Sequence, residues 1–337
     1  MQIQRKRPNG RLRAYRCWTP AAVLFALLAV APVRAQTQFR AWNTHPDGYP
    51  VSLAMESFAE AVNQGTAGRY TVKVFSNGVL ASDQANAVQM VKQGEIDLAE
   101  FNLSPLAEAA PGAKVLTLPF LFRDSEHMFR HLDGKLGLQF ASKLKDSGYV
   151  VLGWYDGGAR HFYCMNKPLR QATDLQGLRI RVQQSEMAIQ MVKLLDATPV
   201  VVPYKEVLDA FKTGRIDCAE NNLPAYESAG HMGVAKHMYL SNHLVSPEVL
   251  VMSVHAWDKL SEADRKVFLA AGRQSAEKMR ELWKARVDLA RTAALKQGTE
   301  FAVSKDYGPL VTKMQPLYAK YFQDAATRHD LFTILAN

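Results

Sequence analysis

An eleven-residue segment occurs twice in the sequence, at 92–102 and 212–222, and this repetition restricts the possible folds more than any other feature. The first copy reads KQGEIDLAEFN and the second KTGRIDCAENN, so seven of the eleven positions are identical. Each copy follows apolar residues at helical spacing and passes through a glycine, Gly94 or Gly214, into a short apolar stretch. A glycine at this point is typical of a helix that ends in a left-handed residue. The pattern predicts two helix–glycine–strand units, 120 residues apart.

Both copies end on asparagine, at Asn102 and Asn222. In open α/β sheets, ligands bind beyond the carboxyl ends of the strands. A chain of about 300 residues also tends to divide into two cores rather than enlarge one. Together these points predict two similar lobes that face one cleft. A common helix-to-strand turn that occurs twice by chance is the alternative interpretation.

The remaining apolar patterns predict an α/β fold. Alternating or continuous apolar stretches predict strands at 39–42, 70–75, 150–155, 178–182 and 199–202. Amphipathic stretches predict helices at 50–63, 83–92 and 125–131, the last with Ser125 as N-cap, and a long helix of about 35 residues from Ser261. Because strands alternate with helices, we expect a mostly parallel sheet in each lobe.

The N-terminus has the pattern of a secretory signal peptide. Residues 1–20 carry six basic side chains and no acid, and an apolar run follows at 21–31. This run is too short for a helix that crosses a bilayer core, which takes about 20 residues. Val33 and Ala35 then supply the small residues that a signal peptidase reads. We expect cleavage after Ala35 and a periplasmic protein; a membrane anchor or a buried helix is the alternative.

The predicted cleavage also changes the net charge. The full chain has 41 basic and 32 acidic residues, a formal charge of +9. The first 35 residues hold seven of the basic residues and no acid, so 34 basic and 32 acidic residues remain after the predicted cut. The remaining chain therefore lacks the basic character of a nucleic-acid-binding protein, and we expect no nucleic-acid partner.

Two cysteines remain after the predicted cut, Cys164 and Cys218. A pair in an oxidising compartment can form a disulfide, but two cysteines in about 300 residues do not make a disulfide framework. We expect small buried thiols, with a disulfide as the alternative.

Motifs of catalysis are absent from the sequence. It contains no His-Glu-x-x-His, no Gly-x-Ser-x-Gly, no glycine-rich phosphate loop and no Cys/His metal spacing. His127 and His131 are four residues apart but lack the intervening glutamate, and we expect them on a solvated helix face rather than at a metal. We expect no enzyme, no catalytic residue, no metal and no cofactor.

Arginines in apolar surroundings are the most distinctive polar residues. Arg160 follows two glycines just past a predicted strand, and Arg179 and Arg181 alternate with apolar residues inside another. A buried cation without a partner costs several kcal/mol, so an acid of the protein or of a ligand must pair with it. The planar guanidinium suits carboxylates in particular. Internal salt bridges, for instance to Asp156, Asp174 or Asp217, are the alternative interpretation.

The run TDLQGLRIRV at 173–182, followed by KTGRID at 212–217 and by Glu220-Asn221, resembles the signature of the substrate-binding subunits of tripartite ATP-independent periplasmic (TRAP) transporters. Similarity to that family extends over essentially the whole chain after the predicted cut. The resemblance implies two α/β lobes, joined by hinge strands and spanned by a long helix. The expected division is 1–35 as signal peptide, 36–157 with about 246–285 as lobe I, and 158–245 with about 286–337 as lobe II.

The resemblance also implies a binding mode. Arg181 takes the place of the arginine that forms the main salt bridge to the ligand carboxylate, Arg160 that of a second arginine, and Asn221 that of a ligand-facing asparagine. The implied partners are a small organic acid and the membrane subunits of a TRAP transporter, with the binding protein itself a monomer. Gln183-Gln184-Ser185 and Cys218 depart from the usual pattern.

Four segments, at 45–50, 155–160, 181–185 and 219–224, resemble the subgroup that binds hexuronates such as glucuronate and galacturonate. A sugar acid needs one carboxylate clamp and several hydrogen-bonding partners for its hydroxyl groups. The implied partners for the hydroxyl groups are His45, Asp83, Asn102, Gln183, Asn221 and Glu248.

Alternatives remain for individual residues and for the function. Asp83 can instead cap the helix that starts there, and Glu248 can instead pair with a lysine at the hinge. The ligand can be another organic acid, such as a C4-dicarboxylate, an aromatic acid or a keto acid. A secreted enzyme that acts on sugar acids is a further alternative, and it would need an acid/base pair in the cleft.

Overall fold

The computed structural model describes residues 1–4, 36–304 and 306–336 of the 337-residue chain. The predicted signal peptide and its cut lie, apart from residues 1–4, outside the described residues. None of the helices in the described ranges combines the length and the hydrophobicity that a membrane span requires.

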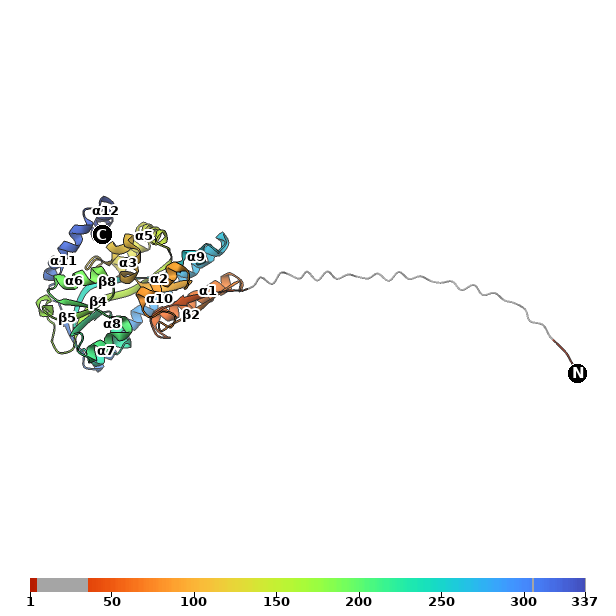
Figure 1. Ribbon diagram of the computed structural model, residues 1–337, viewed down its shortest axis with the longest axis horizontal. Helices are drawn as coiled ribbons and strands as arrows, with labels where there is room; N and C mark the ends of the chain where they lie inside the picture. Colours follow the sequence, from red (N-terminus) through yellow and green to blue (C-terminus); the bar gives the residue numbers. More distant parts are fainter. Residues whose placement is uncertain (5–35, 305, 337) are drawn as a thin grey trace. The chain divides into compact units, whose positions relative to one another are not determined.

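Nine strands within the described ranges form one mixed sheet, with the order β2-β1-β3-β8-β4-β7-β5-β6 and with β9 paired to β8. The strands are β1 (Thr37–Trp42), β2 (Tyr70–Phe75), β3 (Leu98–Asn102), β4 (Tyr149–Cys164), β5 (Arg179–Val182), β6 (Thr198–Val201), β7 (Cys218–Asn221), β8 (His237–Ser253) and β9 (Glu300–Val303). The two longest strands, β4 and β8, pair antiparallel in the middle of the sheet (Figure 1).

The sheet has two halves built in the same way. In lobe I, β1 pairs in parallel with β2 and β3, and in lobe II, β5 pairs in parallel with β6 and β7. The long strands β4 and β8 run antiparallel to their neighbours β7 and β3 and connect the two halves. The predicted mostly parallel sheet in each lobe is confirmed. The residue boundaries of the lobes stay a prediction.

The long helix α10 connects the two lobes along one face. It covers Glu262–Lys296, 35 residues, and packs against α1 of lobe I and α8 of lobe II. Ser261 is its N-cap, as predicted, since the Ser261 hydroxyl oxygen accepts a hydrogen bond from the Asp264 amide at 3.1 Å. The other α-helices are α1 (Pro50–Gly65), α2 (Gln84–Gln93), α3 (Leu103–Ala109), α4 (Ser125–Leu132), α5 (Lys135–Asp146), α6 (Glu186–Leu194), α7 (Val207–Lys212), α8 (Leu223–Ser228), α9 (Val254–Trp257), α11 (Gly308–Tyr321) and α12 (Ala325–Leu335).

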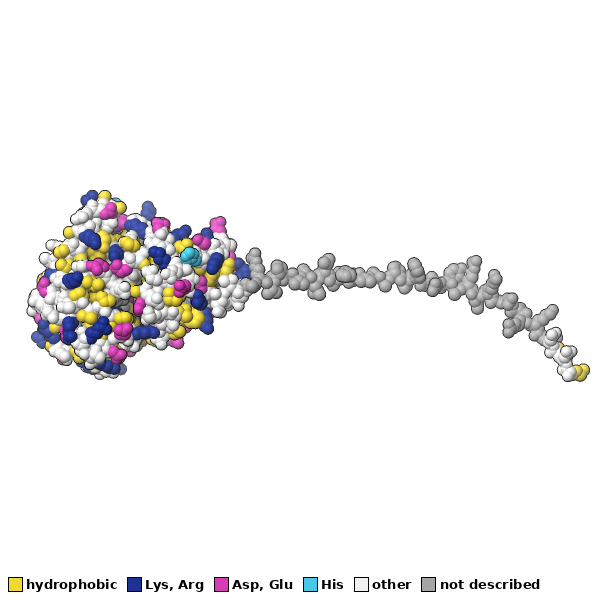
Figure 2. All heavy atoms as spheres, viewed as in Figure 1, with side chains coloured by type: hydrophobic (Ala, Val, Ile, Leu, Met, Phe, Trp, Pro, Cys, Tyr) yellow, Lys and Arg dark blue, Asp and Glu magenta, His cyan; other side chains and the backbone are white. Residues whose placement is uncertain are grey.

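Apolar side chains fill both faces of the sheet. In lobe I, Phe101 and Phe140 belong to the cluster under α2 to α5, and Phe58 and Phe268 to the cluster under α1 and α10. In lobe II, separate clusters lie under α6 with α11 and under α7 with α8. On the face shown in Figure 2, acidic and basic side chains are interspersed between smaller apolar areas.

The two copies of the repeated segment occupy equivalent places. Gly94 and Gly214 have φ values of 79° and 67°, so both are left-handed as predicted. β3 and β7, which follow them, each lie between a parallel neighbour and one long antiparallel strand. At the ends of the copies, Asn102 caps α3 by accepting from the Ser104 amide, and Asn222 caps α8 by accepting from the Ala225 amide.

Two expectations for α4 are wrong. Its N-cap is Asp124 rather than Ser125, because the Asp124 carboxylate accepts from the His127 amide at 2.7 Å. His127 and His131 are buried rather than solvated, with exposed fractions of 1% and 8%. The C-terminal helix α12 packs against this site, and His127 Nε2 lies 3.0 Å from the Ile334 carbonyl of that helix. The two histidines also contact each other, with 3.2 Å between their Nε2 atoms. The sequence of α4 contains no signal for this distant contact.

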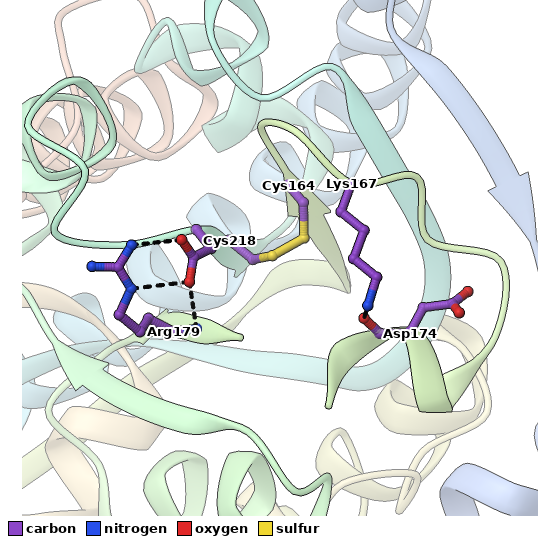
Figure 3. The surroundings of a disulfide bond; sticks show 6 residues. Cys164, Lys167, Asp174, Arg179 and Cys218 are labelled. Atoms are coloured by element: carbon purple, nitrogen blue, oxygen red, sulfur yellow. Dashed lines mark hydrogen bonds and ion pairs between the residues drawn. A yellow bond between two sulfur atoms is a disulfide. The ribbon is translucent and has the colours of Figure 1, made fainter. Parts of the chain in front are cut away.

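The expectation of free thiols is also wrong, because Cys164 and Cys218 form a disulfide (Figure 3). The two residues face each other in the antiparallel pairing of β4 with β7, with their Cα atoms 4.1 Å apart. Such a cross-strand neighbour depends on the strand register, which the cysteine count does not contain. The disulfide links β7 to β4 three residues before Asn221.

Candidate functional site

Arg181 is a fully buried arginine of β5, with 2% of its surface exposed. Its Nε donates to the Val202 carbonyl at 2.9 Å, whereas its Nη1 has no partner among the described residues. No acidic side chain in the described ranges forms an ion pair with it. Burial lowers the pKa of the Arg181 guanidinium, because the protein solvates this charge poorly. The charge of Glu220 offsets part of this effect, but no acidic side chain of the described ranges reaches Arg181 within ion-pair distance.

Arg179, two residues earlier on the same strand, has a different environment. Its side chain is 46% exposed, and it forms a two-bond ion pair with Asp217, at 2.6 and 3.0 Å (Figure 3). The prediction of two buried arginines on this strand is thus wrong for Arg179. It lies at the start of β5, where the strand reaches solvent, and the proposed internal salt bridge to Asp217 is realised there.

Arg160 of β4 is buried and forms an ion pair with Glu220. Its Nε and Nη2 donate to the two carboxylate oxygens of Glu220 at 2.6 and 2.8 Å. Its Nη2 also donates to the Glu220 carbonyl, and its Nη1 to Asn221 Oδ1 at 2.8 Å. Four of the five guanidinium protons are therefore donated within the protein. The partner is none of the three aspartates considered from the sequence.

Glu220 owes its charge to this pairing. Burial alone raises the pKa of its carboxyl group, but the charge of Arg160 and the hydrogen bonds from Arg160 and His243 lower the pKa to about 2. The Arg160–Glu220 pair fixes Asn221, whose Oδ1 accepts from both Arg160 and the Asn222 amide. The ligand roles of Arg160 and Asn221 stay predictions.

On the lobe I side, Asn102 and Glu248 face each other in the pairing of β3 with β8. Asn102 Nδ2 donates to Ser246 at 2.6 Å, and the Asn102 side chain also hydrogen-bonds Glu248. Glu248 Oε2 has no partner within the described ranges, and none of the ion pairs there joins Glu248 to a lysine. Burial is the main cause that raises the pKa of Glu248 to about 8, so the carboxyl group is mostly neutral at pH 7.

His45 adds an aromatic ring from the loop before α1. The ring stacks on Tyr49 at 4.1 Å between centroids and meets the edge of Tyr204 at 6.0 Å. Its Nδ1 has no hydrogen-bond partner in the described part of the chain. Burial lowers the pKa of His45 to about 3, so its imidazole is neutral at physiological pH.

A pocket beside Arg181 brings residues of both lobes together. Asp83 and Gln183, both predicted from the sequence, lie in its wall. Asp83 also caps α2, since its carboxylate accepts from the Asn86 amide at 2.8 Å, so the capping alternative holds for this residue as well. The lining residues are Thr44, Ser82, Asp83, Gln84, Ala85, Pro105, Arg181, Gln183, Gln184, Val201, Val202, Pro203, Tyr204 and Lys205.

The two lobes touch directly beside this pocket. Lys205 of lobe II donates through Nζ to the carbonyls of Asn77 and Gly78 in lobe I. On the other side, the Glu186 amide at the start of α6 donates to the Glu108 carboxylate of α3 at 2.9 Å. The two lobes are therefore in direct contact at these two places.

Sequence reasoning missed Glu100, Tyr49 and Trp283. Each is at most 3% exposed, and each has a side-chain polar atom without a partner among the described residues. Buried polar atoms are nearly always hydrogen-bonded, so a concentration of exceptions marks a place built for other partners. We name this concentration the central polar cluster; its members are His45, Tyr49, Glu100, Arg181, Glu248 and Trp283.

Contacts connect the members of the central polar cluster. Tyr49 stacks on His45 and meets Trp283 edge-on at 6.1 Å. Glu248 is close enough to Glu100 to raise the pKa of Glu100. The pKa of Tyr204 is affected by the charges of both Arg181 and Glu248. The repeat itself contained a signal for Glu100, which matches Glu220, whereas Trp283 lies in the long helix without any signal. Among the described residues, no three His, Cys, Asp or Glu side chains gather as metal ligands.

Comparisons with known proteins give matches over most of the chain. Residues 42–324 match the family described as bacterial extracellular solute-binding protein, family 7. A solute-binding protein of Chromohalobacter salexigens is 37% identical over 327 residues, which cover 96% of this chain and 97% of the relative.

Two solved structures of TRAP periplasmic solute-binding proteins are similar over nearly their whole length. The protein from Roseobacter denitrificans, with bound β-D-glucuronate, is 37% identical, with a TM-score of 0.85, and the match covers 88% of this chain and 98% of that chain. The protein from Bradyrhizobium sp. BTAi1, in complex with α/β-D-galacturonate, is 36% identical, with a TM-score of 0.86, covering 89% and 100%.

Proposed function

Because the chain belongs to the bacterial extracellular solute-binding protein family 7, we propose that it captures a hexuronate, such as D-glucuronate or D-galacturonate, for a TRAP transporter. In this proposal a signal peptide, cut after Ala35, exports the chain to the periplasm. The mature protein acts as a monomer and delivers its ligand, chemically unchanged, to the membrane subunits.

The observation that carries the proposal is the buried Arg181 guanidinium without an acidic partner. Burying an unpaired charge costs several kcal/mol, which a protein tolerates where a ligand supplies the opposite charge. A carboxylate fits best, because it accepts two parallel N–H bonds from a guanidinium. The pocket beside Arg181 admits a ligand that touches both lobes.

The charged side chains nearest in effect to Arg181 are Glu220 and Arg160, which pair with each other. Other members of the central polar cluster are mostly neutral, and they suit the hydroxyl groups of a sugar. His45 is neutral, and Glu248 is mostly protonated at pH 7. Neutral imidazole, carboxyl and amide groups both donate and accept hydrogen bonds, as hydroxyl groups do. In this arrangement Arg160 donates one proton to Asn221 and three to Glu220, and it has one remaining proton for the ligand.

The lobes supply the mechanism of capture and release. The ligand carboxylate docks on Arg181 while the cleft is open, and lobe I then closes over it by a hinge motion. The contacts of Lys205 with Asn77 and Gly78 stabilise the closed form, and the membrane subunits recognise this form. The ligand leaves when the lobes separate.

A thermal-shift panel combined with a product assay tests the proposal. The panel contains D-glucuronate, D-galacturonate, C4-dicarboxylates, keto acids and aromatic acids. A ligand at a thousand times its Kd stabilises a protein by about 4 kcal/mol, so a true ligand gives a clear shift. We expect shifts with the uronates and no product. A shift with C4-dicarboxylates alone would reject the hexuronate assignment, and consumption of a uronate would reject passive binding.

A further inference from the structure

We propose that Glu100 is a specificity-determining residue whose carboxyl group binds a hydroxyl group of the sugar acid on the lobe I side of the cleft. This inference rests on the proposed hexuronate function and assigns one contact within it. Glu100 lies on β3, between Ala99 and Phe101, whose side chains belong to the apolar core.

Glu100 is buried without any hydrogen bond. Its exposed fraction is 1%, and neither Oε1 nor Oε2 has a partner among the described residues. A carboxyl group has two oxygens that normally take several hydrogen bonds, and leaving them unmade in the interior is costly. A group with no structural bond gives its neighbours little stabilisation, so a ligand contact is the role that its burial supports.

The strand geometry points Glu100 toward the predicted ligand residues. Side chains alternate along a strand, so Glu100 and Asn102 share one face of β3. Glu248 lies opposite Asn102 on β8, on that same face. Two other atoms of the central polar cluster without partners, the Tyr49 hydroxyl and Trp283 Nε1, lie beneath α10 and α1 on this side. Polar atoms without hydrogen-bond partners in the described ranges therefore occur next to one another on this face, from Glu248 to Glu100.

The ionisation of Glu100 fits a hydroxyl partner. Burial, and then the nearby Glu248, raise the pKa of Glu100 well above its usual value. Burial therefore favours the protonated carboxyl group, which donates one hydrogen bond and accepts others. A sugar hydroxyl does the same, so the two groups match without bringing another charge into the cleft.

Calorimetry with matched ligands tests the inference. The Kd of the wild type, Glu100→Gln and Glu100→Leu is measured for D-glucuronate and for its 2-, 3- and 4-deoxy analogues. Leucine should weaken D-glucuronate binding about tenfold or more, and glutamine, which donates and accepts, should keep most of the affinity. For the one analogue that lacks the contacted hydroxyl, the leucine penalty should fall below about twofold.

Ser253→Ala provides the matched control, because Ser253 Oγ is also buried without a partner in the described ranges but, three residues beyond Leu250 on β8, faces the opposite side of the sheet from Glu100. This change should leave the Kd of each ligand equal to that of the wild type. An equal leucine penalty for all four ligands, or no penalty at all, would overturn the role of Glu100 while leaving hexuronate binding intact. Absence of binding by the wild type would overturn the proposed function itself, and this inference with it.

Discussion

The two copies of the repeated segment place one glutamate each in the interior, and the two glutamates differ in their partners and in the direction of their pKa shifts. Glu220 in lobe II accepts two hydrogen bonds from Arg160, and its pKa falls to about 2. Glu100 in lobe I has no partner in the described chain, and burial raises its pKa well above the usual value. One glutamate is held in an ion pair, and the other has free hydrogen-bonding capacity while burial disfavours its ionisation.

The cause of this difference lies on the neighbouring long strand. Glu220 pairs in register with Phe162 of β4, which brings Arg160 within reach. Glu100 pairs in register with Leu250 of β8, and within the described ranges no basic side chain forms an ion pair with it or contributes to its pKa. The repeated backbone unit thus buries an acid in each lobe, and the strand beside it decides whether the acid supports the fold or remains open to a ligand.

The largest expected effect separates Arg181 from the paired Arg160. Arg181→Met should weaken hexuronate binding more than about a thousandfold, because the ligand carboxylate loses its cation in a buried site. The same change should leave the ligand-free protein folded, with a melting temperature equal to or about 2–4 °C above that of the wild type. Calorimetry and thermal unfolding measure the two effects.

Arg179→Met is the control for this prediction. Its ion pair with Asp217 is largely exposed and contributes little, so binding and stability should change only slightly. If Arg181→Met lowered the stability of the ligand-free protein by several kcal/mol, Arg181 would be a structural residue like Arg160.

The second prediction exchanges the two glutamates for their neutral analogues. Glu220→Gln should lower the free energy of unfolding by about 3–5 kcal/mol, because it leaves Arg160 charged and buried without an anion. Glu100→Gln should change it by less than about 1 kcal/mol, since the Glu100 carboxyl group forms no hydrogen bond among the described residues that the change would remove. Denaturant titration at pH 7 measures both, and equal losses would contradict the distinction between the lobes.

The third and smallest effect concerns pH. Glu220 has a lowered pKa, so its contribution to stability is full above the unfolded value of 4.5 and is lost as the pH falls toward 2. Glu100 has a raised pKa, so its contribution is full below 4.5 and is lost as the pH rises. The wild type compared with Glu220→Gln should therefore gain stability from pH 3 to 5. Compared with Glu100→Gln, it should lose stability from pH 5 to 8, and slopes of the same sign would contradict the assignment.

Local patterns predicted most of the fold. The repeat gave both helix–glycine–strand units because its glycines had to be left-handed, and Ser261 marked the start of the long helix correctly. The apolar pattern of β5 predicted the burial of Arg181 correctly, but the same pattern was wrong for Arg179 at the start of the strand.

What the sequence did not contain depends on register and on distant contacts. The Arg160–Glu220 pair joins positions 60 residues apart, and the burial of His127 depends on α12 at the other end of the chain. Trp283 enters the central polar cluster only because the long helix crosses the cleft at that residue. Patterns within one element carry no information about such neighbours.

The disulfide described above has a topological consequence. It closes a covalent ring between Cys164 and Cys218, 54 residues apart, and the ring contains Arg181, Gln183, Tyr204 and Lys205. A ring of this size removes about 4 kcal/mol of chain entropy from the unfolded state. The residues that line the pocket from lobe II therefore lie within one covalently closed loop. Even in a partly unfolded protein, the disulfide limits how far these side chains can separate.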